Sequence, residues 1–122
     1  MFMSITYKYD LENRTFIFAR DVRAFLRTIP RDVINFEDIK QLTRSSGSVG
    51  ANYLEANEGL STKDFYYRLK ICKKEAKESA YWLSLLFLNN DQVLDNERNL
   101  LIREANEFVR IFSSIVSRHA GK

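Results

Sequence analysis

The sequence predicts an all-α fold, an antiparallel up-and-down four-helix bundle, and three observations lead to this prediction. Four segments repeat apolar residues at helical spacing. The 122 residues include one proline and four glycines, too few to form the turns of an all-β fold. The connections between the segments are short, which favours antiparallel neighbours. At this length we expect a single domain over residues 1–122.

The first helix is expected from about Leu11 to Ile29, because the residue before Pro30 disfavours the α region. One face is apolar and consists of Leu11, Phe18, Ala19, Val22, Phe25, Leu26 and Ile29. The opposite face carries an arginine stripe of Arg20, Arg23 and Arg27. Residues 1–10 alternate loosely and are expected to form an arm, either flexible or docked on the domain.

The second helix is expected over 33–57, with Gly59 as a left-handed stop. Its apolar stripe consists of Ile39, Leu42, Val49, Tyr53 and Leu60. Residues 44–52, RSSGSVGAN, form helix poorly on propensity alone, so tertiary contacts must compensate. Small side chains in this stretch would let a neighbouring helix approach closely.

A polar face on the same helix holds Arg44, Ser48, Asn52 and Glu55. Two interpretations remain open. The face is either solvated, or it meets partners on another helix or subunit in a buried hydrogen-bonded network. The small residues nearby favour the network, because close backbone approach has no use on a solvated face.

The third helix is expected from a Ser61 cap to about Asn89, with Asp64 completing an arrangement like a capping box. Its core face consists of Phe65, Leu69, Cys72, Ala76, Leu83, Leu86 and Phe87. Within roughly a 60° arc on the far side lie Lys63, Lys70, Lys74 and Lys77. Near one flank lie Glu75 and Trp82, and Trp82 with Tyr66 and Tyr81 either anchors an interface or packs at the core edge.

The fourth helix is expected to begin at Asp91 or Asp95 and to continue to about Ser117. Its apolar residues cover about 200° of the circumference, against ~100° for an ordinary surface helix. They are Leu100, Leu101, Ile102, Ala105, Phe108, Val109, Ile111, Phe112, Ile115 and Val116. The surplus predicts a second buried contact, with a partner subunit as its candidate.

Catalytic chemistry is not predicted. His119, the single histidine, follows the last periodic position, so neither a Glu-x-x-His metal site nor a histidine-based triad can be assembled. We expect no metal, no cofactor and no enzymatic activity. Cys72 lies on the core face, where it is expected to be a small buried hydrophobe. The GSVG run at 47–50 matches a nucleic-acid-binding KH loop only weakly, because it lies within a helix.

Charge and cellular setting add modest expectations. The net charge is +3 and the isoelectric point is near 9.1, which points mildly toward anionic partners. No apolar run is long enough to span a membrane, and a single cysteine suits the cytoplasm. The lysine and arginine stripes are either ordinary solvated faces or surfaces that bind a phosphate backbone.

Two long motifs carry a family resemblance. QLTRSSGSVGANYLEANEG (41–59) and KDFYYRLKICKKEAKESAYWLSLL (63–86) closely resemble the bacterial four-helix bundle proteins encoded within 23S rRNA intervening sequences. The resemblance extends more loosely over the first and last helices. Cys72 stands where alanine is usual, and the DFYYRLK stretch is unusually aromatic.

The resemblance implies a homopentameric barrel, a kinship with the accessory bundle protein of diversity-generating retroelements, and no established enzymatic activity. That accessory protein is a basic pentamer that binds nucleic acid and a reverse transcriptase. Eight residues match family motif positions: Arg44, Ser48, Asn52, Glu55, Lys70, Lys74, Glu75 and Trp82.

Two functions follow as hypotheses. The first is a non-enzymatic homo-oligomer that binds RNA or DNA through Arg20, Arg23, Arg27, Lys63, Lys70, Lys74 and Lys77. The second is a structural or adaptor protein that oligomerises and docks a protein partner. In either case Arg44, Ser48, Asn52, Glu55, Glu75, Trp82, Phe108 and Phe112 are expected to form the interface or a structural network.

Overall fold

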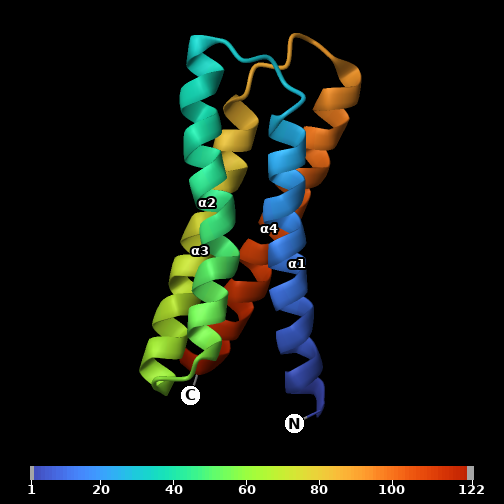
Figure 1. Ribbon diagram of the computed structural model, residues 1–122. Coiled ribbons are helices and arrows are strands. Elements are labelled where there is room, and N and C mark those ends of the chain that lie inside the picture. The colour runs from blue at the N-terminus through green and yellow to red at the C-terminus, as the bar shows by residue number, and fades with distance from the viewer. Residues whose placement is uncertain (1, 121–122) are drawn as a thin grey trace.

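A computed structural model describes the backbone of residues 2–120 and the side chains of residues 10–119. It contains four helices: α1 (Phe2–Leu26), α2 (Val33–Asn57), α3 (Thr62–Leu85) and α4 (Gln92–Ala120). Each helix runs antiparallel to the one before it, and short loops join them (Figure 1). The described residues contain no strand, so the predicted all-α four-helix bundle is confirmed.

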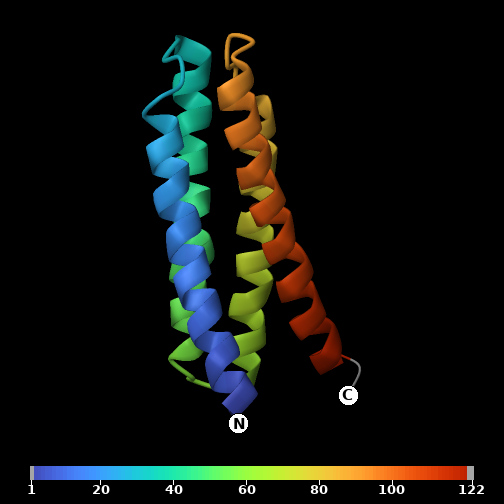
Figure 2. The same ribbon diagram turned by 90° about the vertical axis from the view of Figure 1, so that its right-hand side faces the viewer.

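The helices form a ring in which each contacts its neighbours in sequence and α1 closes onto α4. The α1–α4 seam is the weakest of the four, and Figure 2 shows the C-terminal half of α4 leaning away from α1. Along this seam Arg14 donates to both carboxylate oxygens of Glu104, at 3.2 and 2.8 Å. The Arg14 guanidinium also lies over the Phe108 ring. A charged pair and a cation–π contact therefore close the ring where apolar packing is thin.

The core follows the predicted apolar faces. Phe18 meets Phe108 edge to face with ring centroids 5.5 Å apart, and Tyr53 and Phe112 pack at 5.8 Å. Other members include Leu11, Val22, Leu42, Val49, Leu69, Cys72, Ala76, Leu83 and Ala105. Full burial of such side chains contributes ~1.5–3 kcal/mol each, so this apolar core is the main stabilising element.

The small residues of α2 allow the close approach that the sequence predicts. A Cβ atom at Gly50 would lie 3.0 Å from the Thr15 hydroxyl oxygen of α1. On the other side of α2, the Ser45 and Ser79 hydroxyls are 2.9 Å apart and fully buried against α3. Glycine and serine therefore let α2 pack tightly against both neighbours, at positions little more than one turn apart.

The ends of the helices differ from prediction in five places. Residues 2–10 form the first turns of α1 rather than a separate arm, although Met1 and the side chains of 1–9 lie outside the described residues. Leu60 follows the end of α2 and is 81% exposed, so its assignment to the core stripe was wrong. The helix α1 ends at Leu26, three residues before the predicted end, and Ile29 is buried in the segment that follows.

The fourth difference is the C-terminus of α3, which ends at Leu85 rather than near Asn89. Phe87 is 53% exposed, so placing it on the core face was also wrong. The cause lies in α2: the buried Asn35 side chain accepts from the Phe87 N–H at 2.8 Å and donates to its carbonyl at 2.7 Å. Asn35 also donates to the Pro30 carbonyl, so one amide ties two loops together and stops α3.

Asp91 caps α4, because its carboxylate accepts from the Leu94 N–H at 3.1 Å. Asn89 and Asn90 take positive φ angles in the preceding turn, a conformation asparagine tolerates better than most residues. Asp95 lies inside the first turn, so of the two predicted start residues Asp91 is the one that caps α4. The helix continues to Ala120, three residues beyond the predicted end.

Candidate nucleic-acid interface

A basic surface of the bundle lies on the outer side of α3. We call it the lysine face, and it consists of Lys63, Lys70, Lys74 and Lys77, all exposed. Lys74 lies 3.7 Å from the Glu78 carboxylate, an i,i+4 pair. Among the described residues the other three lysines form no ion pair. The spatial arrangement predicted from helical spacing is therefore present.

The lysine face is bordered by a shallow groove between α3 and α4. Lys70, Lys73, Lys74 and Lys77 line it, with Glu78 and Val116 completing the wall. Lys73 was not part of the predicted stripe, because it lies at the flank of the helix, where it is partly buried. The groove thus holds four ammonium groups against one carboxylate.

The arginines of α1 do not form the single solvated stripe that the sequence suggested. Arg20 and Arg27 are exposed, but Arg23 turns toward α2. Its guanidinium donates to the Ala19 carbonyl at 3.0 Å and to the Thr43 carbonyl at 3.1 Å. The nearby Gly47 leaves room for it: a Cβ there would lie 3.1 Å from Arg23 Nη2. Arg23 therefore joins α1 to α2. Helical spacing alone does not predict this contact.

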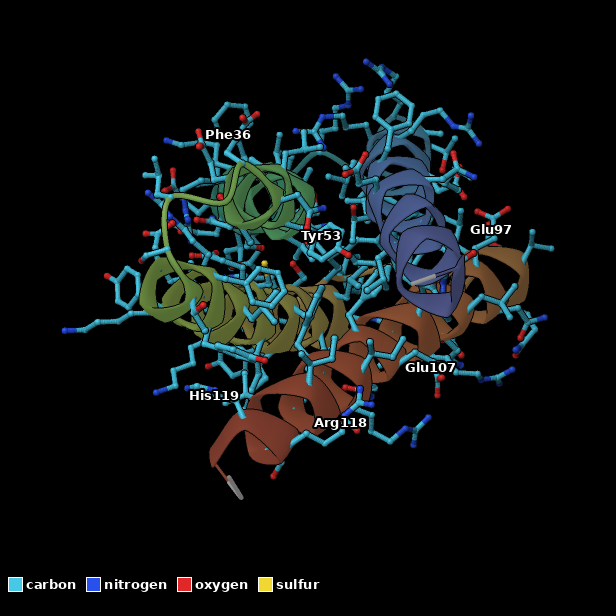
Figure 3. All side chains as sticks on the ribbon, turned by 90° about the horizontal axis from the view of Figure 1, so that it is seen from below. Phe36, Tyr53, Glu97, Glu107, Arg118 and His119 are labelled. Atoms are coloured by element: carbon cyan, nitrogen blue, oxygen red, sulfur yellow. The ribbon has the colours of Figure 1, made fainter. Side chains whose placement is uncertain are left out.

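A second basic surface lies between α1 and α2 near their shared loop, and we call it the arginine groove. Arg23, Arg27 and Arg31 line it together with Leu26, Phe36, Ile39 and Thr43. Figure 3 shows Phe36 on the outer side of α2. Helical spacing did not predict Arg31 and Phe36 as members of this groove. Arg31 belongs to the loop, and Phe36 does not lie on the apolar stripe of α2.

The two basic surfaces face different directions. Helices α1 and α3 each pack against α2 and α4, and among the described residues no Cα atom of α1 lies within 8 Å of a Cα atom of α3. They therefore occupy opposite corners of the ring (Figures 1 and 2). One chain consequently cannot present both surfaces to the same short stretch of a linear ligand.

The polar face of α2 meets α3 within the same chain. Arg44 donates to Glu75 at 3.3 Å and to Glu78 at 3.0 Å. Glu75 is only 6% exposed, whereas the Arg44 side chain remains half exposed. About two turns further along α2, Asn52 accepts from Arg68 at 3.3 Å and donates to the Ser48 carbonyl at 2.9 Å.

The α2–α3 seam therefore contains a hydrogen-bonded network in which Asn52 is partly buried, whereas Arg44 takes part in it and stays exposed to solvent. Ser48 is partly buried and contributes its carbonyl oxygen. Glu55 is exposed.

The predicted aromatic residues lie at the core or its edge. Phe108 and Phe112 are fully buried inside the bundle, where they face α1 and α2 rather than solvent. Trp82 is partly buried against the core and lies 5.1 Å from the Tyr81 ring. Tyr66 stacks on His119 at 3.8 Å, which fixes the last turns of α4 against α3.

The Cys72 side chain is buried in the core of the bundle. Burial raises the pKa of the Cys72 thiol to about 12, so it is a protonated core side chain at neutral pH. No cluster of three or more histidine, cysteine, aspartate or glutamate side chains that could hold a metal ion occurs in the described part of the chain. None of the described helices is long and apolar enough to cross a membrane.

Comparisons with known proteins agree with this architecture. No protein with a curated description matches the chain. The fold is similar to the crystal structure of a protein of unknown function from the S23 ribosomal protein family of Bacteroides thetaiotaomicron. The two share 28% identity and a TM-score of 0.73, over 90% of this chain and 97% of that one. Residues 8–114 match the family of 23S rRNA-intervening sequence proteins, and the chain therefore belongs to that family.

Proposed function

We propose that the protein is a non-enzymatic homo-oligomer that binds RNA or DNA through its basic helix faces. The observation that carries the proposal is the lysine face, where four exposed ammonium groups follow one side of α3. The one ion pair that they form with a described residue, Lys74 with Glu78, is exposed on the lysine side and therefore weak. The lone buried cysteine suits a reducing, cytoplasmic setting.

Electrostatics favours an extended anion as the ligand. Lysine side chains behave as flexible point charges, which suits contact with phosphates more than recognition of individual bases. Each phosphate contact releases condensed counterions, so affinity should fall with salt by a slope of about −0.7 to −0.9 per contact. The net charge of +3 is too small for strong binding by one chain, so several copies must act together.

Self-association is supported by the apolar surface of α4 and by the two basic surfaces, which face different directions on one chain. Leu100 is exposed, and Leu101, Ile102, Val109, Ile111, Ile115 and Val116 are only partly buried. A second copy covering part of this surface would remove apolar area from water. A ring of copies would also repeat the lysine face around one assembly. Five copies are favoured by the family resemblance.

Fluorescence anisotropy with a structured RNA, measured across a salt series, tests the proposal. We expect binding at low salt that weakens steeply as salt rises. The triple variant Lys70→Gln, Lys74→Gln, Lys77→Gln should weaken binding at least tenfold. A matched control removes three positive charges from the outer side of α4, by the substitutions Arg103→Gln, Arg110→Gln and Arg118→Gln. Binding that is absent at low salt, or equal effects of the two triple variants, would refute the assignment to the lysine face.

A second candidate function is an adaptor that docks a protein partner. It is favoured by an apolar cluster where α2 begins and α3 ends, beside the α1–α2 and α3–α4 loops. The cluster consists of four exposed residues, Val33, Ile34, Leu85 and Phe87. Affinity capture from the native host separates the two functions. Co-purifying nucleic acid that nuclease removes supports the first, whereas a protein partner that survives nuclease treatment supports the second.

A further inference from the structure

The arginine groove differs from the groove beside the lysine face in its apolar side chains, since Leu26, Phe36 and Ile39 lie among the arginines, whereas Val116 lies among the lysines. Leu26 is buried and Ile39 partly buried, and both lie beneath the rim formed by Arg27 and Arg31. Its volume is about 280 Å³, at the lower edge of the range for small-molecule sites. The groove therefore suits a small flat group rather than a globular ligand.

The charges around the groove have one sign. Three arginines and no carboxylate line it. Hydrogen bonds to the Thr43 and Ala19 carbonyls hold the Arg23 guanidinium in place. The side chains of Arg27 and Arg31 form no ion pair or hydrogen bond with the described residues, so both guanidinium groups remain available to an anion. Guanidinium groups bind phosphate through two parallel N–H donors, which favours a phosphate-bearing ligand.

Phe36 supplies an aromatic ring beside these charges. The side chain is 54% exposed although a phenylalanine there adds nothing to the core. Lys40 Nζ lies 5.6 Å from the ring centroid, over its face, and 3.6 Å from Glu37. Lys40 covers one face of the ring, and the remaining ring surface, which lines the arginine groove, is open to solvent. It can therefore stack with a flat π system, such as a nucleobase.

We propose that the arginine groove binds unpaired nucleotides, with a base stacked on Phe36 and the flanking phosphates held by Arg27 and Arg31. This inference rests on the proposed nucleic-acid function and assigns a preference within it. In a duplex the base faces are covered by neighbouring bases, so only a single strand or loop can use the ring. The lysine face holds Tyr67, which is 60% exposed between Lys63 and Lys70, so the effect of Phe36→Leu, and not a single-strand preference alone, identifies the arginine groove.

The test compares an unstructured 20-nucleotide RNA with the fully paired duplex of the same sequence, by anisotropy at low salt. Phe36→Leu should weaken single-strand binding about fivefold or more, since base stacking contributes ~1–3 kcal/mol per base. It should leave duplex binding unchanged. Phe36→Trp keeps an aromatic ring and should retain the affinity for the single strand. Phe87→Leu is the matched control, because Phe87 is equally exposed but lies on the α2–α3 side.

The outcomes separate this inference from the function on which it rests. A tighter single-strand complex that Phe36→Leu weakens and Phe87→Leu does not would support the stacking site. Equal effects of Phe36→Leu on single strand and duplex, or no effect on either, would overturn the stacking site while RNA binding stands. Binding of neither RNA by the unaltered protein would overturn both. Circular dichroism of each variant checks that the helices are intact.

Discussion

The hydroxyl groups of Ser45 and Ser79 lie 2.9 Å apart at the centre of the α2–α3 seam, and both side chains are fully buried. The Ser79 hydroxyl also contacts the Glu75 carbonyl, one turn back on α3, at 2.9 Å. Each serine therefore satisfies a buried polar group of the other helix while keeping the backbones close. The pair explains how a segment with poor helix propensity forms a regular helix in this bundle.

A double-mutant cycle on this pair should show coupling. Ser45→Ala and Ser79→Ala should each lower the free energy of unfolding by about 1 kcal/mol, because each substitution leaves the hydroxyl of the other serine buried without its partner. The double variant should lose less than the sum, with a coupling of at least ~0.5 kcal/mol. Urea denaturation measures all four proteins. Strictly additive losses would show that the hydroxyls do not depend on each other.

Gly50 and Gly47 provide a matched pair for the close approach of α1 to α2. Alanine in place of glycine gains ~1 kcal/mol from helix propensity at both positions. At Gly50 the new Cβ would lie 3.0 Å from the Thr15 hydroxyl oxygen and 3.2 Å from its Cβ, on a rigid neighbouring helix. At Gly47 it meets only the end of the long Arg23 side chain.

Gly50→Ala should therefore be less stable than Gly47→Ala by at least ~1 kcal/mol in thermal or urea unfolding. Equal stabilities of the two variants would mean that α1 can move away from α2 at little cost.

Asn35 of α2 should be the most sensitive of the polar residues that hold the loops. Asn35→Ala leaves the Phe87 N–H and the Pro30 carbonyl without their partner, which should cost about 2–4 kcal/mol. Asn96→Ala is the control, because the Gln92–Asn96 hydrogen bond is exposed and its loss should cost less than ~0.5 kcal/mol. Urea denaturation measures both. A loss below 1 kcal/mol at Asn35 would contradict its role in joining the two loops.

Cys72 should make stability fall in alkaline solution. Burial raises the pKa of the folded thiol from 9.0 to about 12, so between those values the unfolded chain holds fewer protons than the folded one. The stabilisation is complete below pH 9 and is lost as the pH rises toward 12, at up to ~1.4 kcal/mol per pH unit. Cys72→Ala removes this titration while other groups remain. The stability difference between wild type and Cys72→Ala should therefore shrink from pH 8 to pH 10.5, and a constant difference would contradict the burial effect.

Much of the fold could be predicted from periodicity alone. The core faces of α1 and α3 were placed correctly because regular spacing of Phe18, Val22, Leu69 and Ala76 determines which side of a helix is buried. The ends were harder, because they depend on single contacts between distant segments. Asn35 stops α3 through a hydrogen bond to Phe87, fifty-two residues away, and local propensity contains no sign of it.

The candidate site was only partly predictable for a related reason. Helical spacing placed the lysine face well, since its residues belong to one helix and stay in solvent. It could not show that Arg23 bridges to α2, because that depends on the space left by Gly47. Arg31 and Phe36 come from a loop and the start of α2, so only the packing of α1 against α2 reveals that they share a groove.

The central claim is that this bundle is a subunit and that nucleic acid binds to the assembly. Native mass spectrometry of the full chain, with and without an RNA oligonucleotide at low salt, tests it most directly. The account predicts a homo-oligomer at a multiple of the 14.4 kDa chain mass, with five copies favoured, and RNA bound to that oligomer. A 14.4 kDa monomer at every concentration, or an oligomer that carries no RNA at low salt, would contradict it.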